Sequence, residues 1–136
     1  MRKMGLDYGE VRIGIAFSDP MGIIANGYET YKRVDEKTDI NHILSLIKEK
    51  EVDTVVIGLP INMDGTYGER VDATKKFGNL LEGHNINVKY IDERLTSVSA
   101  ERMLIDADVR REKRKQVIDK IAASIILQSY LDKNIK

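Results

Sequence analysis

The hydrophobic pattern of this chain keeps the period of a strand through its first segments and then changes to the period of a helix, and this change limits the folds that the chain can adopt. Residues 4–8 and 11–17 alternate between apolar and small or polar positions, as half-buried strands do. Residues 23–31 can form a third strand, and residues 9–10 and 18–20 have the composition of tight turns. Three consecutive strands with short links predict an antiparallel meander.

Helices and strands alternate along the rest of the chain. Apolar residues recur at helical spacing in several segments, and the segment over residues 54–59 is apolar along its length, as in a strand that is covered on both faces. In order, the predicted elements are a helix around residues 40–47, a strand over 54–59, a helix through 71–81 that stops at Gly83, a strand over 87–92, a helix capped by Thr96 or Ser97, and a final helix that ends near Asp132.

This order of elements predicts one α/β domain over residues 1–136, with a mixed five-stranded sheet and helices on its faces. With the first strand near the centre, the strand order is 3-2-1-4-5. The order reverses between the first and the fourth strand, and open sheets bind their ligands at such a reversal. No internal repeat or interdomain linker interrupts the pattern.

The composition excludes several classes of protein. The 22 Lys and Arg residues balance 22 Asp and Glu residues, so the chain is not a histone-like polycation, and only local patches can attract an acidic partner. The absence of cysteine excludes disulfide scaffolds, cysteine-ligated zinc and thiol nucleophiles. No apolar run approaches the roughly 20 residues that span a bilayer, and the chain starts with strand-like sequence rather than a signal peptide. We therefore expect a cytoplasmic protein with no membrane partner.

One face of the first two strands carries only small residues beside Asp7, and a packed element must cover that face closely. The final helix offers Ala122 and Ala123, a small pair that lets a helix backbone approach a sheet. Asp119 precedes this pair by three and four positions and therefore shares its helix face. If that face packs on the sheet, Asp119 approaches Asp7. The small residues of the strands are Gly5, Gly14 and Ala16.

Three carboxylates are predicted to meet at the carboxyl edge of the sheet: Asp7, Glu93 and Asp119. Three such groups in one cleft would repel each other, so they call for a cation. Oxygen ligands of this kind suit Mg²⁺ or Mn²⁺. Two such ions about 4 Å apart would activate a water and stabilise a leaving oxygen, which is the chemistry of phosphodiester hydrolysis.

Each acid taken singly also has an ordinary structural interpretation. Asp7 is a turn former or a cap in that interpretation, Asp119 pairs with Lys115 one helical turn away, and Glu93 is a solvated loop residue. Asp92 can also take the place of Glu93. The convergence of the three acids on one sheet edge favours the metal site.

Basic residues are concentrated next to the proposed site. Residues 110–120 hold six basic side chains against two acidic ones, which suits contacts with phosphates but also a solvated helix entrance. Arg12 and Arg94 are candidates to clamp a phosphate, or to neutralise the acid cluster. The basic residues predicted to grip a nucleic-acid backbone are Arg110, Arg111, Lys113, Arg114 and Lys115.

Short motifs follow one another along essentially the whole chain. They are Gly5-Leu6-Asp7-Tyr8-Gly9, Arg12-Ile13-Gly14-Ile15-Ala16 with Ser18-Asp19, Gly58-Leu59-Pro60 with Asn62 and Gly65, Asp92-Glu93-Arg94-Leu95-Thr96-Ser97, and Asp119-x-x-Ala122-Ala123 with Leu127 and Leu131. In this order and spacing they resemble the YqgF (RuvX) family. The last two motifs together are far more specific than the opening motif alone.

The resemblance implies an RNase H-like fold related to the RuvC resolvases, and a bacterial cytoplasmic nuclease that uses a divalent metal. Asp7, Glu93 and Asp119 are the matching acids. The family is generally assigned to maturation of the 5′ end of precursor 16S ribosomal RNA. Related resolvases carry an extra acid on the last helix, and the neighbours of Asp119 supply none, which leaves open whether one or two metal ions bind.

The leading hypothesis is therefore an endonuclease that acts on structured nucleic acid, precursor ribosomal RNA rather than branched DNA, with the small ribosomal subunit as a possible partner. The first alternative is a Holliday junction resolvase, which would need two sites and hence a homodimer rather than a monomer. A non-catalytic RNA-binding module is a further alternative. An actin-like kinase would need a second domain, for which 136 residues leave no room.

Overall fold

The computed structural model describes the backbone of residues 1–60, 65, 68–92 and 111–134, and the side chains of these residues except 111–118 and 134. The strands are β1 (Arg2–Tyr8), β2 (Arg12–Ser18), β3 (Ala25–Lys32), β4 (Val52–Leu59) and β5 (Val88–Asp92). The helices are α1 (Glu36–Glu49), α2 (Glu69–Glu82) and α4 (Arg111–Asn134). The predicted helix that starts at Thr96 or Ser97 lies outside the described residues.

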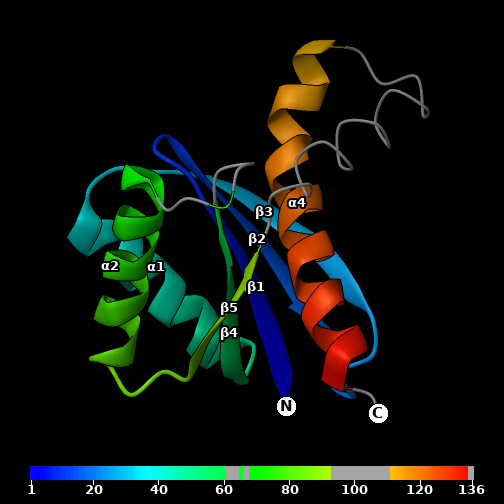
Figure 1. Cartoon of the computed structure of the whole chain (residues 1–136). Helices are drawn as coiled ribbons and strands as arrows, with labels where there is room; N and C mark the ends of the chain where they lie inside the picture. The colour runs from blue at the N-terminus through cyan, green and yellow to red at the C-terminus, as the bar shows by residue number, and fades with distance from the viewer. Residues whose placement is uncertain (61–64, 66–67, 93–110, 135–136) are drawn as a thin grey trace.

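The strands form one mixed sheet in the order β3-β2-β1-β4-β5, which confirms the predicted order. β1, β2 and β3 are antiparallel neighbours, whereas β4 lies parallel to β1 and β5 parallel to β4. Helices α1 and α2 lie on one side of the sheet and α4 lies on the other (Figure 1). The order reverses between β1 and β4, as the sequence predicts.

The main core lies between the sheet and the helices α1 and α2. The alternation of β1 places Met4, Leu6 and Tyr8 in this core, and the alternate residues of β2 join them. Val11, which the alternating pattern assigns to the same face, is 57% exposed. The prediction is wrong there because β2 begins only at Arg12, so that Val11 belongs to the turn and its carbonyl accepts a hydrogen bond from the Arg33 N–H (2.9 Å).

Helix α4 packs on the opposite face, across the small residues of β1 and β2. A Cβ atom added to Gly5 would lie 2.7 Å from the carbonyl oxygen of Ala123, and one added to Gly14 would overlap the carbonyl oxygen of Asp119. Ala122 and Ala123 are almost fully buried. The small residues on both sides therefore let the helix backbone lie directly on the sheet, as predicted.

A buried carboxylate lies near the start of α1. Asp39 has no exposed surface, and it accepts hydrogen bonds from Arg33 Nε (2.9 Å), the Tyr31 hydroxyl (2.9 Å) and the Val34 N–H (3.0 Å). Burial alone would raise the pKa of Asp39, but these three hydrogen bonds together hold the pKa below its ordinary value.

This lowered pKa makes a pH-dependent contribution to stability. A carboxyl whose pKa is lower in the folded state stabilises the fold above its ordinary value of 3.8, and this contribution is lost as the pH falls through the folded-state value. We expect Asp39→Asn to lower the free energy of unfolding at pH 7 by about 2 kcal/mol and to flatten its decline below about pH 4. Urea unfolding at several pH values measures both effects. Equal pH slopes in the wild type and the variant would contradict the assignment.

None of the described helices combines the length and the apolar character that a membrane crossing requires.

Candidate active site

Asp7 lies near the carboxyl end of β1, at the edge of the sheet where the strand order reverses. It pairs in register with Gly14 of β2 and is half-buried. Because side chains alternate along a strand, Asp7 shares the face of Gly5, which is the face that α4 covers. The fold therefore places a carboxylate at the ligand-binding edge of an open sheet, on the side of α4.

Asp119 comes to the same place from the last helix. Its backbone carbonyl lies directly on Gly14, the residue opposite Asp7 in the β1–β2 pair. The glycine is the physical reason for this approach, because any side chain at position 14 would occupy the volume of the helix backbone. The backbone of Asp119 thus lies beside the strand pair that carries Asp7, as the sequence predicts, whereas the roles of the two acids as metal ligands stay a prediction.

Arg12 forms an ion pair with Asp119. Its Nε atom donates to Oδ2 of Asp119 at 2.6 Å, with 43% of the Arg12 side chain and 20% of the Asp119 side chain exposed. This contact is consistent with the predicted neutralisation of the acid cluster by Arg12, whereas the binding of a phosphate by Arg12 stays a prediction. The carboxylate of Asp119 therefore has a cationic partner at this edge.

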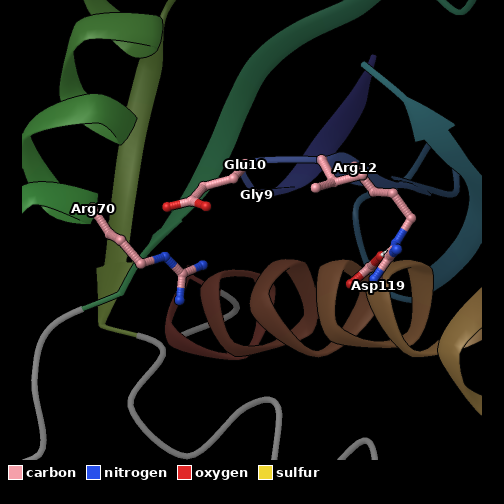
Figure 2. A pocket seen from close by; sticks show the side chains of 6 residues that line it. Gly9, Glu10, Arg12, Arg70 and Asp119 are labelled. Carbon is pink, nitrogen blue, oxygen red and sulfur yellow. Dashed lines mark hydrogen bonds and ion pairs between the residues drawn. The ribbon is translucent and has the colours of Figure 1, made fainter.

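A pocket of about 350 Å³ opens at this ion pair. Arg12 and Asp119 form one side, and Arg70 reaches into the pocket from α2 with Glu10 between them (Figure 2). Gly9 and Val11 complete the lining. The pocket therefore combines two arginines with two carboxylates, which suits a ligand that carries both phosphate and a bound cation.

Two charged residues of the pocket were not predicted as site residues: Glu10, which the sequence assigns only to a turn, and Arg70. Arg70 stands in the first turn of α2, and this helix follows the loop after β4. The usable signal is topological, since the connection from the carboxyl end of a parallel strand starts at the ligand-binding edge. A basic residue at the start of the following helix is therefore a candidate to face the ligand.

The other predicted site residues are described in part or not at all. Glu93, Arg94 and Arg110 lie outside the described residues. Arg111, Lys113, Arg114 and Lys115 belong to the first turns of α4, and their side chains are not described. Asp92, the alternative to Glu93, ends β5 at the same sheet edge as Asp7 and is exposed. Among the described side chains, no three acidic or histidine residues lie close enough together to hold a metal ion.

The donors that are described nevertheless fit a hard divalent cation. Asp7 and Asp119 offer carboxylate oxygens, and Asp119 already holds a cationic group in Arg12. Mg²⁺ needs only one or two protein carboxylates because it keeps several waters and takes phosphate oxygens from its substrate. Asp119 lines the open pocket, and Asp7 lies near the end of the neighbouring strand, so their carboxylates match that requirement in kind.

Similar sequences extend over almost the full length of the chain. A protein of Heliobacterium modesticaldum is 52% identical over 133 residues, which cover 97% of this chain and 89% of the relative. A protein of Clostridioides difficile is 52% identical over 132 residues, which cover 96% of this chain and 94% of the relative. A protein of Streptococcus equi subsp. zooepidemicus is 52% identical over 138 aligned positions, which cover 98% of this chain and 99% of the relative. Each is named "Putative pre-16S rRNA nuclease".

Two solved structures with a similar fold are resolvases of low sequence identity. The fowlpox virus resolvase in complex with Holliday junction DNA has a TM-score of 0.61 at 15% identity, with all of both chains covered. Thermus thermophilus RuvC in complex with a Holliday junction substrate has a TM-score of 0.57 at 12% identity, and the match covers 99% of this chain and 96% of the RuvC chain. These similarities confirm the expected fold.

A family model described as "RuvX: Holliday junction resolvase" matches residues 1–133. This match covers the motifs around Asp7, Glu93 and Asp119, and it agrees with the relatives and with the fold. The chain therefore belongs to the RuvX (YqgF) family.

Proposed function

We propose that this protein is a divalent-metal-dependent endonuclease that hydrolyses phosphodiester bonds at the 5′ end of precursor 16S ribosomal RNA. The observation that carries the proposal is the approach of α4 to Gly14, which brings Asp119 beside the strand pair of Asp7 and next to a pocket with two arginines. The names of the relatives, which are half identical over nearly the full length, support the RNA substrate.

The chemistry follows from the donors at the sheet edge. Asp7, Asp119 and Glu93 would hold Mg²⁺ or Mn²⁺, which supplies activation of a water and stabilisation of the leaving oxygen. Water adds to phosphorus and one phosphorus–oxygen ester bond breaks, which yields a phosphate monoester and an alcohol. Arg12 and Arg70, on two sides of the pocket, are placed to bind the non-bridging phosphate oxygens.

The basic start of α4 extends this interface. Arg111, Lys113, Arg114 and Lys115 belong to the first turns of α4, and we infer that they contact the nucleic-acid backbone together with Arg110 and Arg94. Such contacts position the substrate without reading its sequence. A protein with this substrate acts in the cytoplasm, and the small ribosomal subunit is its candidate partner.

The second candidate is a Holliday junction resolvase. The description of the family and the structural similarity to two resolvases favour it. Cutting a four-way junction symmetrically requires two active sites, so this function predicts a homodimer, whereas RNA trimming is compatible with a monomer.

Two substrates and one chelator test the proposal. We expect cleavage of a 5′-extended 16S precursor fragment in Mg²⁺ or Mn²⁺, its complete loss in EDTA, and its return when the metal is added back. A fragment with the mature 5′ end serves as the control for cleavage at the precursor site. Product lengths on a denaturing gel are the measurement.

The outcomes separate the candidates. Cleavage of a four-way DNA junction alone would favour the resolvase. Cleavage that persists in EDTA would contradict a metal nuclease. A folded protein that binds the RNA equally with and without EDTA, and cuts neither substrate, would indicate a non-catalytic RNA-binding module.

A further inference from the structure

The turn of Gly9 and Glu10 joins the two strands that carry Asp7 and Arg12. Both residues line the pocket at the Arg12–Asp119 pair, and both also line a second pocket of about 220 Å³ on the α2 side. The Gly9 N–H donates to the carbonyl oxygen of Arg12 at 2.9 Å and closes the turn. The position of this turn therefore sets the wall between the two pockets and the distance between Asp7 and Arg12.

Arg33, which follows β3, holds this turn through several contacts. Its Nη1 atom donates to the carbonyl oxygens of Gly9 (3.1 Å) and Glu10 (3.4 Å), and its backbone N–H donates to the carbonyl oxygen of Val11 (2.9 Å). Its guanidinium lies 4.7 Å from the centre of the Tyr8 ring. One arginine thus contacts four consecutive residues, 8–11, between the candidate metal ligand and the arginine of the pocket.

Asp39 binds Arg33 on the side of the guanidinium that faces away from the turn. The Asp39 carboxylate is fully buried and accepts from Arg33 Nε at 2.9 Å, so the two ends of the guanidinium are bound to a helix and to the turn. Burial of a charge destabilises the folded state unless the charge is paired and hydrogen-bonded. The Tyr31 hydroxyl and the Val34 N–H also donate hydrogen bonds to the Asp39 carboxylate. This arrangement leaves Arg33 little freedom to turn elsewhere.

We propose that Arg33 and Asp39 are positioning residues of the active site: they fix the Gly9–Glu10 turn and thereby the relative placement of Asp7 and Arg12. The inference rests on the proposed nuclease function. Lysine cannot replace Arg33 in this role, because a single ammonium lacks the planar fork that donates to the carboxylate on one side and to two carbonyls on the other.

The test compares Arg33→Gln and Arg33→Lys with the wild type. We expect both variants to lower kcat for RNA cleavage by about 10- to 100-fold with little change in KM, because a displacement of about 1 Å at reacting groups has effects of this size. A direct contact between Arg33 and a substrate phosphate would instead raise KM in Arg33→Gln, and Arg33→Lys would restore it. That result would overturn the positioning role.

A matched variant separates positioning from simple loss of stability. Leu46 is buried on the same helix as Asp39, towards its other end, and Leu46→Ala lowers stability without touching the turn. We expect Leu46→Ala to keep kcat within about twofold at a temperature where all variants are folded, since only positioned groups control the chemical step. Equal losses of kcat in Leu46→Ala and Arg33→Gln would overturn the proposal.

Amide hydrogen exchange tests the same inference without activity. In Arg33→Gln we expect exchange of the Gly9 N–H to accelerate about tenfold or more, with unchanged protection of the β1–β4 pairing. Unchanged exchange at Gly9 would overturn the positioning role even if cleavage is lost. Accelerated exchange in a protein that shows no nuclease activity would support the positioning of the turn and contradict only the proposed function.

Discussion

We expect Asp7→Asn to lower the rate of RNA cleavage by about a thousandfold or more while the fold is retained. The substitution removes one negative charge and one strong metal ligand at the reversal of the strand order, with almost no change in volume. A divalent metal supplies several kcal/mol of transition-state stabilisation, which corresponds to a loss of this size. The measurement is the single-turnover cleavage rate in Mn²⁺ together with circular dichroism and thermal unfolding.

The matched control is Asp53→Asn. Asp53 lies near the start of β4, at the opposite end of the same sheet, and forms an ion pair with Lys3 at 2.6 Å. Asp53→Asn also removes one carboxylate charge from the sheet. We expect it to lower the free energy of unfolding by at most about 1 kcal/mol, as for other partly exposed ion pairs. We expect full cleavage activity in this variant. Retained cleavage in Asp7→Asn, or an equal loss in both variants, would contradict the assignment of Asp7 to the metal site.

The second large effect concerns a residue with no functional group. We expect Gly14→Ala to lower the free energy of unfolding by about 3 kcal/mol and to remove cleavage activity. A Cβ atom at position 14 would overlap the carbonyl oxygen of Asp119, which is backbone and cannot turn aside. Helix α4 must therefore move away from β2, and Asp119 moves with it. Urea unfolding and the cleavage assay measure the two effects.

Gly27→Ala is a graded control for this prediction. Gly27 lies on β3 under the same helix, but a Cβ atom there would stand 3.1 Å from the carbonyl oxygen of Lys120, so a shift of a few tenths of an ångström accommodates it. We expect a loss of less than about 1 kcal/mol and activity close to that of the wild type. If Gly14→Ala were no more destabilised than Gly27→Ala, the close approach of α4 at Asp119 would not be essential for the fold.

The fold could be predicted from the sequence to a large extent because its signals are local and agree with each other. The alternation in β1 and β2, the apolar run over residues 55–59 of β4 and the helical spacing in α1 fix the element types, and the order of the elements leaves few topologies for the sheet. Val11 was the exception, because alternation continues into a turn without any change in the residue pattern.

The sequence predicts parts of the candidate site only where a local motif indicates how the chain packs. Asp7 and Asp119 stand next to small residues whose spacing indicates a helix packed on the sheet, and the close approach of the Asp119 backbone to Gly14 follows from that packing. Arg70 gave no such signal, because an arginine at the start of a helix is common and its face is set by the tertiary fold. The Arg33–Asp39 pair was missed for the same reason: Asp39 lies within the charged first turns of α1, and nothing local shows that it is buried.

The sequence by itself determined the order of the described elements, the two faces of the central strands and the small residues on which α4 packs. These properties depend on side-chain period and on residue size, both of which are local. Only the tertiary structure decided that Arg12 lies on Asp119, that Arg70 lines the same pocket and that Arg33 holds the turn between Asp7 and Arg12. These contacts join residues that are far apart in the sequence, and their long side chains can reach several partners until packing of the helices on the sheet selects one.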